Sequence, residues 1–224
     1  MKLPLSTRLL ACAGFVNKGD RVADIGCDHG YLSIHLLTNG IARSCIASDV
    51  AKGPLQSAKD NARKFGVSEN ITFHLSDGVQ SIPRDFDTLV CAGMGGDTMI
   101  HILQSAPWLK SERYRLILQC QSKRPELRKW LYENGFAIRR ETLAKDGKFC
   151  YPVTEVVYAP GEHLKGAEFY ITPAIRASGS PLLQEFYQRV VGGIKTSVEG
   201  LSRTGGEKYE EMKAILEELL EMKL

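Results

Sequence analysis

Short apolar runs alternate with amphipathic stretches over residues 1–160, and this alternation predicts an α/β fold. The apolar runs have the length of strands, and the stretches between them carry apolar residues at helical spacing. Gly40 and Gly66 close two of the expected helices, and Ser6 or Thr7 caps the first one. The pattern predicts a mostly parallel, seven-stranded sheet with helices on both faces and an antiparallel pair at its end. Strands are expected at residues 21–25, 44–48, 71–75, 88–91, 115–118, 137–143 and 153–158, and helices at 5–10, 31–39, 54–65 and 125–134.

The alternation stops near Pro160, and a different pattern follows. Apolar residues recur at steps of three or four over 182–201 and again over 209–222, separated by the glycine-containing segment 204–206. Two such helices joined by a short turn form an antiparallel hairpin. We therefore expect an α/β domain over residues 1–160 and a helical hairpin over residues 161–224. The hairpin could pack on itself or on the α/β domain, or it could bind a substrate or mediate dimerisation. The protein is accordingly expected to be a monomer or a weak dimer.

The composition is that of a globular protein that needs neither metal nor disulfide to build its core. The 224 residues are 43% hydrophobic and 25% charged, and no apolar run approaches the ~20 residues of a membrane helix. The first eight residues lack the apolar stretch of a signal peptide. Six widely spaced cysteines without a Cys-x-x-Cys pair argue against a zinc site and predict buried thiols. We expect a cytoplasmic protein with no metal site and no membrane partner.

Positive charge is concentrated in the α/β part of the chain. Residues 1–160 contain 21 lysines and arginines and 16 acidic residues, whereas residues 161–224 contain 8 and 10. This modest excess suits a polyanionic partner, although a solvated surface is the simpler interpretation for most of these side chains. The candidates for phosphate contacts are Arg8, Lys52, Lys123, Arg124, Arg128, Lys129, Arg139 and Arg140.

Acidic residues and glycines gather just after the expected strands, where open parallel sheets bind their ligands. The first turn, residues 24–30, begins with Asp24 and contains Gly26 and Gly30. Its glycines let a ligand approach the backbone, the Asp24 carboxylate suits an ammonium group, and the following helix N-terminus suits a carboxylate. A dinucleotide fingerprint would read Gly-x-Gly-x-x-Gly, so this spacing favours S-adenosylmethionine over NAD.

The next strand ends repeat this chemistry. Asp49 can accept hydrogen bonds from both ribose hydroxyls, and Asp77, followed by Gly78, can accept one from the adenine amine. Each aspartate alone could instead cap a helix or a turn, but three of them in order on successive strands favour the cofactor. The fourth strand end, residues 93–96, offers bare backbone to a flat methyl acceptor, forms a tight turn, or does both.

These motifs resemble those of the bacterial tRNA (adenine-22-N1)-methyltransferase family, whose members are class I methyltransferases with a Rossmann-like fold. The similarity runs in register over about residues 3–158, and the helical hairpin fits the family's C-terminal appendage. The Asp28-His29 pair and the Gly93–Gly96 loop are its most specific parts. The matching segments are residues 5–9, 23–29, 52–54, 92–96, 116–119 and 127–131.

The resemblance implies methyl transfer from S-adenosylmethionine to N1 of an adenine in the D-arm region of tRNA. Adenine N1 is a neutral lone pair, so positioning and desolvation should matter more than a strong base. Residues expected at the cofactor are Arg8, Asp24, Gly26, Cys27, Asp28, Asp49, Val50, Asp77, Gly78, Ala92 and Gly93. Residues expected at the acceptor base are Met94, Gly95, Gly96, Gln119, Gln121 and Arg128, and those expected in catalysis are Asp28, His29, Met94 and Gly95.

Two positions depart from the family's usual pattern. Cys120-Gln121 stand where Pro-Asn is usual, which bears on substrate preference, although the Gln121 amide can still donate and accept hydrogen bonds. Asp49 stands where glutamate is common and has a shorter reach to the ribose. A methyltransferase with another RNA position or a protein as its acceptor stays open, as does a binding module without chemistry. The missing dinucleotide fingerprint disfavours an NAD-linked oxidoreductase.

Overall fold

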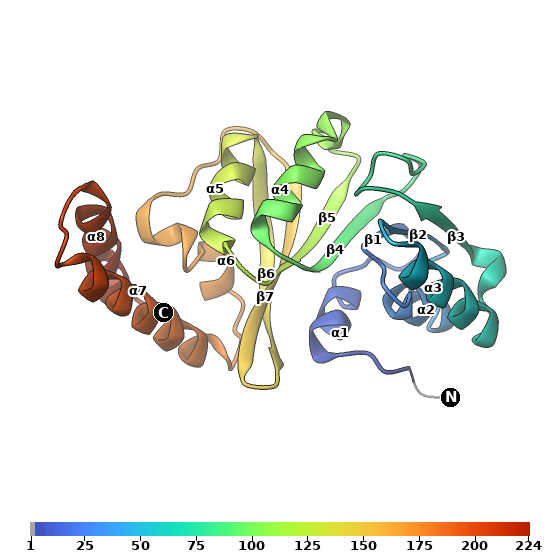
Figure 1. Cartoon of the computed structure of the whole chain (residues 1–224), viewed down its shortest axis with the longest axis horizontal. Helices are drawn as coiled ribbons and strands as arrows, with labels where there is room; N and C mark the ends of the chain where they lie inside the picture. The colour runs from blue at the N-terminus through green and yellow to red at the C-terminus, as the bar shows by residue number, and fades with distance from the viewer. Residues whose placement is uncertain (1–2) are drawn as a thin grey trace.

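The computed structural model describes residues 3–224 and confirms the predicted α/β architecture (Figure 1). One seven-stranded sheet has the order β3-β2-β1-β4-β5-β7-β6. Neighbouring strands are parallel from β3 to β5, whereas β7 is antiparallel to both β5 and β6. The strands are β1 (Arg21–Ile25), β2 (Ser44–Asp49), β3 (Ile71–Leu75), β4 (Thr88–Met94), β5 (Arg115–Cys120), β6 (Phe136–Asp146) and β7 (Phe149–Tyr158).

Helices cover both faces of the sheet. Side chains of α1, α2 and α3 fill one hydrophobic cluster against the strands, and those of α4 and α5 fill a second cluster on the opposite face. The helices are α1 (Thr7–Ala13), α2 (Tyr31–Thr38), α3 (Lys52–Lys64), α4 (Gly96–Gln104), α5 (Arg124–Glu133), α6 (Pro173–Arg176), α7 (Leu183–Leu201) and α8 (Glu207–Glu221), with short 3₁₀ turns η1 (Ser68–Asn70), η2 (Pro107–Leu109) and η3 (Gly166–Phe169).

The strand order reverses between β1 and β4, because β2 lies on one side of β1 and β4 on the other. In an open parallel sheet, such a reversal opens a crevice at the carboxyl ends of the strands. The expected ends of β1, β2 and β3 are confirmed to within one residue. Strands β4 and β5 run further than expected, to Met94 and Cys120, because a bulge skips Gly93 and lets Met94 pair with Cys120.

Local chemistry explains where the first helices begin. Ser6 caps α1 as predicted, and its hydroxyl accepts a hydrogen bond from the Leu9 amide at 3.4 Å. Gly30, at φ +71°, turns the chain into α2. Helix α3 begins at Lys52, two residues before the predicted start at Pro54, because proline needs no amide hydrogen in a first helical turn.

Helices α7 and α8 pack against each other and form the predicted helical hairpin at one end of the molecule (Figure 1). Two short elements that the sequence did not predict, η3 and α6, precede the hairpin and pack against α5 and β6. One hydrophobic cluster joins Leu143 and Cys150 of the β6–β7 pair to Ile175, Phe186 and Leu219. The division into an α/β domain over residues 1–160 and a hairpin over residues 161–224 stays a prediction. Residues 1 and 2 of the expected α/β domain lie outside the described range.

A buried ion pair connects this C-terminal segment to the sheet. Arg128 of α5 donates to Glu141 of β6 at 2.8 Å, and their side chains are 5% and 0% exposed. Arg128 also donates to the carbonyl groups of residues 169 and 170, and Glu141 accepts from two threonine hydroxyls. The Arg128 guanidinium is therefore buried and occupied within the protein, and nothing in the structure supports its expected contact with the acceptor base or a phosphate.

The remaining expectations about composition concern the membrane and the thiols. Within residues 3–224, no helix has both the length and the apolar character needed to span a membrane. All six cysteines are free and buried, as predicted. Burial raises the pKa of Cys12 and of Cys91 to about 12. These thiols stay protonated near neutral pH and pack as small apolar side chains.

Candidate active site

An open cleft of about 690 Å³ lies at the carboxyl ends of β1 and β4, where the strand order reverses. Its walls come from α1, the β1–α2 turn, the start of α2 and the end of β4. It brings together nine of the residues expected from the sequence, namely Arg8, Asp24, Gly26, Cys27, Asp28, His29, Ala92, Gly93 and Met94. Residues from three separate segments of the chain therefore meet at the predicted place.

Asp24 is the buried acid of the cleft. Its residue is 4% exposed, and its carboxylate accepts a hydrogen bond from the Ser33 hydroxyl of α2 at 2.7 Å. Burial raises the pKa of Asp24 to about 6, and the charge of nearby Asp49 acts in the same direction. A cation entering the cleft would favour the ionised carboxylate, so this position suits a positively charged group.

The β1–α2 turn is held by its backbone. The amides of Gly26 and Cys27 both donate to the Ser48 carbonyl at 2.9 Å, and Gly26 has a φ of +70°. Asp28 also has a left-handed backbone, at φ +50°, and its amide donates to the Asp49 carboxylate at 3.1 Å. Within residues 3–224 the Asp28 carboxylate accepts no backbone hydrogen bond, so this side chain does not hold the turn. The Asp28 side chain is exposed and lies 3.6 Å from His29 Nε2.

Asp49 and Asp77 stand at the ends of β2 and β3, as predicted. The Asp49 carboxylate accepts from the amides of Asp28 and Ala51, at 3.1 and 2.9 Å, so it both shapes the turn and keeps lone pairs for a ligand. Beside it, Val50 is 73% exposed, which is unusual for a large apolar residue. The Asp77 side chain is exposed and lies 3.8 Å from His101 of α4. The ends of β2 and β3 thus present two carboxylates and an uncovered apolar side chain.

The Gly93–Gly96 loop is closely packed against neighbouring side chains. Gly93 has a φ of +84°, and a Cβ on it would lie 2.9 Å from Arg8 Nη1. A Cβ on Gly95 would lie 2.9 Å from the Ser122 hydroxyl. A Cβ on Gly26, across the cleft, would lie 2.2 Å from Met94 Cε. The loop is a tight turn, and it also borders the cleft with bare backbone and the Met94 side chain.

Arg8 and Gln119 form a polar contact beneath this loop. The Arg8 guanidinium donates to Gln119 Oε1 at 2.9 Å and lies 3.4 Å from the Asp146 carboxylate. Gln119 is fully buried at the end of β5, and its Nε2 has no partner among the described residues. Gln121, two residues further along the chain, has an exposed side chain, and its backbone amide donates to the Met94 carbonyl at 2.9 Å. Of these two glutamines, only Gln121 is exposed for contact with a substrate.

Several candidate phosphate contacts are paired within the protein. Lys123 lies 2.5 Å from the Asp97 carboxylate, and Arg139 lies 2.5 Å from that of Glu162. Arg140 pairs with Glu155, and Lys129 lies 4.0 Å from Glu133. Arg124 differs from these, because no carboxylate lies within ion-pair distance of its guanidinium in the described part of the chain.

Sequence reasoning missed two groups of residues near the cleft. Leu9, Tyr31 and Leu32 line the cleft. Tyr31 could have been predicted there, because it begins the helix directly after Gly30 of the cofactor turn. Phe149 and Tyr151 line a neighbouring groove, and nothing in their local sequence points to the cleft because the β6–β7 turn brings them there. Within residues 3–224, no cluster of three or more His, Cys, Asp or Glu side chains has the arrangement of a metal site.

Known proteins share both the sequence and the fold of this chain. The chain is 35% identical over 153 residues to the tRNA (adenine(22)-N(1))-methyltransferase of Bacillus subtilis, a match that covers 68% of this chain and 64% of that protein. The crystal structure of the B. subtilis M1A22 tRNA methyltransferase TrmK superposes with a TM-score of 0.81 at 28% identity, covering 98% of this chain and 96% of the other. Sp1610 of Streptococcus pneumoniae, solved in complex with S-adenosyl-L-methionine, superposes with a TM-score of 0.82 at 29% identity, covering 95% and 99%.

The sequence match spans less than two thirds of the B. subtilis protein, whereas the structural match covers nearly the whole of both chains. The resemblance noted in the sequence is confirmed by these matches. The family model described as a methyltransferase domain matches residues 5–154, which contain the whole of strands β1 to β6. The chain belongs to the methyltransferase-domain family.

Proposed function

We propose that this protein transfers a methyl group from S-adenosylmethionine to N1 of adenine 22 in tRNA. The observation that carries this proposal is the cleft itself, which brings Asp24 and the turn after β1 against Gly93 and Met94 of the glycine-rich loop. Asp49 is bonded to the same turn, and Asp77 stands just after the neighbouring strand β3. The relatives named for this activity match the fold over nearly their whole length. A tRNA substrate also implies that the protein acts in the cytoplasm. The oligomeric state, a monomer or a weak dimer, stays a prediction.

The residues of the cleft fit S-adenosylmethionine in charge and in shape. Asp24 would face the ammonium group, and the free amides at the start of α2 would face the carboxylate of the same amino acid. Asp49 would accept the ribose hydroxyls and Asp77 the adenine amine. The exposed Val50 side chain offers an apolar surface for the adenine ring. Gly26 and Gly93 line the cleft with bare backbone, because Met94 and Arg8 pack where a Cβ would stand.

Positioning is the main task of the protein in this reaction. The cofactor supplies an electrophilic methyl group, and adenine N1 attacks it with a lone pair, so no proton has to be removed first. The Gly93–Gly96 loop and the Met94 side chain would hold the base against the cleft, and Gln121 would offer its amide to the base edge. Holding reactants in line and excluding water supplies a large part of such rate enhancements.

Asp28 and His29 stand where they could touch the acceptor base. Both side chains are exposed and line the cleft, and the Asp28 carboxylate lies 3.6 Å from His29 Nε2. The carboxylate could accept a hydrogen bond from the adenine amine and thereby orient N1. This role gives Asp28 contact with the substrate rather than with the fold.

A methylation assay on defined transcripts tests the proposal. Purified protein, labelled S-adenosylmethionine and unmodified tRNA transcripts should give 1-methyladenosine at position 22, mapped by nuclease digestion and mass spectrometry, and none when adenine 22 is replaced by guanine. Label at another position or on protein would replace the proposed acceptor. Cofactor binding without any transfer would support the binding-module alternative.

Asp28→Asn gives this assay its sharpest variant. Asparagine tolerates a positive φ, so the turn should survive the change. We expect normal cofactor affinity and roughly a hundredfold lower activity, the size of an effect confined to the transition state. Near-normal turnover would remove Asp28 from catalysis and leave the rest of the proposal intact.

A further inference from the structure

A second groove, of about 930 Å³, begins at the Gly93–Gly96 loop and runs away from the cleft. We call it the acceptor groove. It is lined by Gly95, Gln121, Arg124, Phe149, Tyr151 and Arg189. These residues come from the turn after β4, the β5–α5 turn, the start of α5, β7 and α7. The groove therefore joins the proposed methyl-transfer site to the helical hairpin, whose role the sequence left open.

Aromatic side chains lie on one wall of the acceptor groove. Phe149 begins β7 at the tip of the β6–β7 turn and is 46% exposed. Its ring centroid lies 6.1 Å from that of Tyr151, at an interplanar angle of 49°. An exposed phenylalanine at a turn adds little to the core, and the exposed part of its ring can receive another flat ring.

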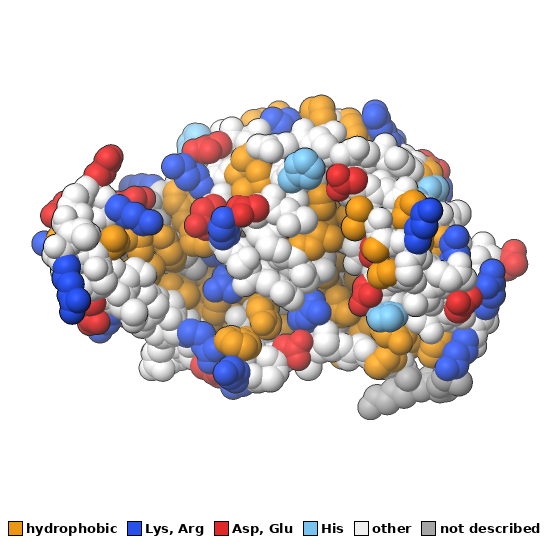
Figure 2. All heavy atoms as spheres, in the orientation of Figure 1, with side chains coloured by type: hydrophobic (Ala, Val, Ile, Leu, Met, Phe, Trp, Pro, Cys, Tyr) orange, Lys and Arg blue, Asp and Glu red, His pale blue; other side chains and the backbone are white. Residues whose placement is uncertain are grey.

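Cations surround this aromatic wall. The Arg189 guanidinium lies 5.5 Å from the Phe149 ring, and the Lys148 ammonium lies 5.4 Å from it. Figure 2 shows hydrophobic side chains beside clustered lysine and arginine side chains on the lower central face, between the helical hairpin and the body of the sheet. Arg189 also lies 3.5 Å from Glu185, which accepts from Lys145 at 2.7 Å, so one carboxylate serves two cations there.

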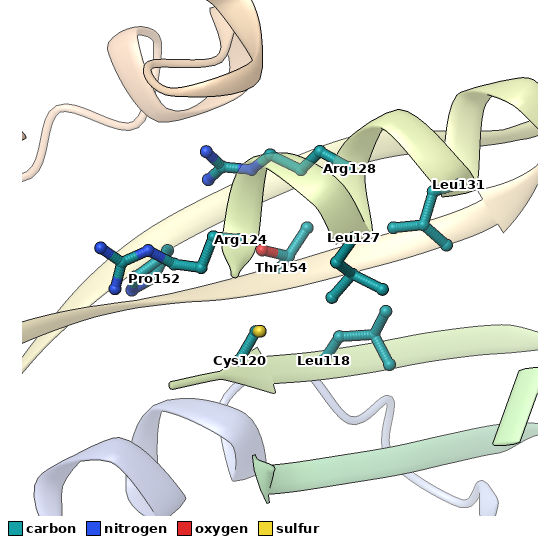
Figure 3. Close-up of a pocket in the computed structure, with 8 residues that line it drawn as sticks. All are labelled: Leu118, Cys120, Arg124, Leu127, Arg128, Leu131, Pro152 and Thr154. Carbon is teal, nitrogen blue, oxygen red and sulfur yellow. The ribbon is translucent and has the colours of Figure 1, made fainter. Parts of the chain in front are cut away.

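Arg124 places a further cation in the groove, and among the described residues no carboxylate lies within ion-pair distance of it. Its guanidinium lies 5.5 Å from the Phe186 ring of α7. Figure 3 shows it extending from the first turn of α5 beside Pro152 of β7, in the same direction as Arg128. Burial lowers the pKa of Arg124, and the charge of Arg128 nearby acts in the same direction. A partly buried guanidinium without a counter-charge attracts an anion more strongly than a solvated one.

We propose that the acceptor groove binds an unpaired nucleotide of the substrate RNA that neighbours the methylated adenine. Its base stacks on Phe149, and its phosphate contacts Arg124 and Arg189. This inference rests on the proposed function, because the groove opens from the loop that would hold the acceptor base. Exposed aromatic faces with arginines beside them are the recognition surface of single-stranded nucleic acid, since every base has a face to stack and every nucleotide a phosphate.

The acceptor groove also assigns a role to the helical hairpin. Arg189 reaches the groove from α7, and Lys145 of β6 holds Glu185 of the same helix. A base flipped toward the cleft leaves its neighbours unstacked, and a stacking surface beside the cleft offsets part of that loss. The hairpin would thus help to keep the D-arm open during methyl transfer.

Binding of an unmodified tRNA transcript to Phe149→Ala and Phe149→Trp tests the stacking contact. We expect roughly 10- to 100-fold weaker binding for Phe149→Ala, the range for loss of one base–aromatic contact, and binding within about threefold of wild type for Phe149→Trp. Leu220→Ala, which removes another exposed apolar side chain, 56% exposed on α8, is the control and should bind normally. Equal binding by wild type and Phe149→Ala would overturn the proposal.

Two further measurements separate the contacts from one another. Arg124→Gln should reduce the slope of log affinity against log salt by about one, as loss of one phosphate contact does. A fluorescent 2-aminopurine next to position 22 should change its emission on binding to wild type and not on binding to Phe149→Ala. An unchanged salt slope together with an unchanged emission would place the RNA elsewhere.

Cofactor affinity, measured by calorimetry for the same variants, distinguishes this inference from the proposed function. Wild-type protein that neither binds S-adenosylmethionine nor methylates tRNA would overturn both. Wild-type protein that methylates adenine 22 while Phe149→Ala binds and methylates equally well would overturn the acceptor groove alone.

Discussion

The two sides of the proposed active site are built in different ways. On the cofactor side, residues 24–30, 49–50 and 77–78 each follow a parallel strand, and backbone hydrogen bonds such as those to the Ser48 carbonyl hold them. On the acceptor side, Gly95, Gln121, Phe149 and Arg189 come from four elements far apart in the sequence. The cofactor side is fixed by the sheet itself, whereas the acceptor side depends on how the β6–β7 pair and α7 pack onto the sheet.

The difference matches the two ligands that we propose. A small cofactor needs a rigid site with few, well-placed polar groups. A large and flexible RNA is better served by an open, charged surface with exposed aromatic rings. Variants that disturb one side and spare the other should therefore separate cofactor binding from RNA binding.

The largest loss of stability is expected for Glu141→Gln, which removes a buried ion pair that supports the acceptor side. Removing this charge leaves Arg128 buried without its partner, and breaking such a pair costs about 3–5 kcal/mol of unfolding free energy. RNA binding should suffer before cofactor binding, because Glu141 joins β6 to α5 and to the segment that leads into α7. Urea unfolding measures the stability, and calorimetry with each ligand measures the binding.

Glu162→Gln is the matched control for this variant. Glu162 pairs with Arg139 at 2.5 Å, but both side chains are 45% exposed, so the loss should stay below about 1 kcal/mol. Similar losses for both variants would mean that burial is not what makes the Arg128–Glu141 pair important.

The difference between the locally built cofactor side and the acceptor side assembled from distant elements also determined what could be predicted from the sequence. Strands β1, β2 and β3 and their aspartates were found because each motif lies within a few residues of its strand end. The acceptor groove could not be found, because Phe149 and Arg189 are 40 positions apart and meet only through tertiary packing. Short elements such as α6 were missed because four residues carry too little periodicity to be recognised.

Arg128 shows a further limit of sequence reasoning. An arginine on an amphipathic helix near a strand end has the sequence pattern of a phosphate contact, and only burial reveals its ion pair with Glu141. Arg8 shows the opposite case, because its matched motif did place it against Gly93 at the cleft. A charge could be assigned from the sequence when a local motif fixed its position, and not when its partner lay on another element.

The next largest effect is expected for Asp24→Asn, on the cofactor side. The variant keeps an acceptor for the Ser33 hydroxyl but loses the charge that would face the cofactor's ammonium group. A hydrogen bond to a charged group contributes about 1.5–3 kcal/mol, so affinity for S-adenosylmethionine should fall roughly 10- to 100-fold. Binding of tRNA alone should not change. Equal loss of both ligands would mean that the two sides are not separable.

The pH dependence of the wild type checks the same carboxylate. Its pKa in the folded protein is about 6, so cofactor affinity should rise as the pH rises through that value and Asp24 ionises. Stability should move in the opposite direction. Between about pH 4 and pH 6 the folded protein holds a proton that the unfolded chain has lost, and the free energy of unfolding falls as the pH rises. Both trends should be weaker in Asp24→Asn.

The smallest effect is expected for Val50→Thr, which changes the apolar surface beside Asp49 and keeps its shape. Val50 is 73% exposed, so the fold gains little from it and the unfolding free energy should not change. If the adenine ring packs against it, the lost apolar contact corresponds to about 0.5–1 kcal/mol, or a two- to fivefold weaker affinity. The loss should be the same for S-adenosylmethionine, S-adenosylhomocysteine and adenosine, because the three share only the nucleoside. A loss confined to S-adenosylmethionine would place Val50 near the methionine moiety instead, and would reverse the orientation in which Asp24 and Asp77 face the two ends of the cofactor.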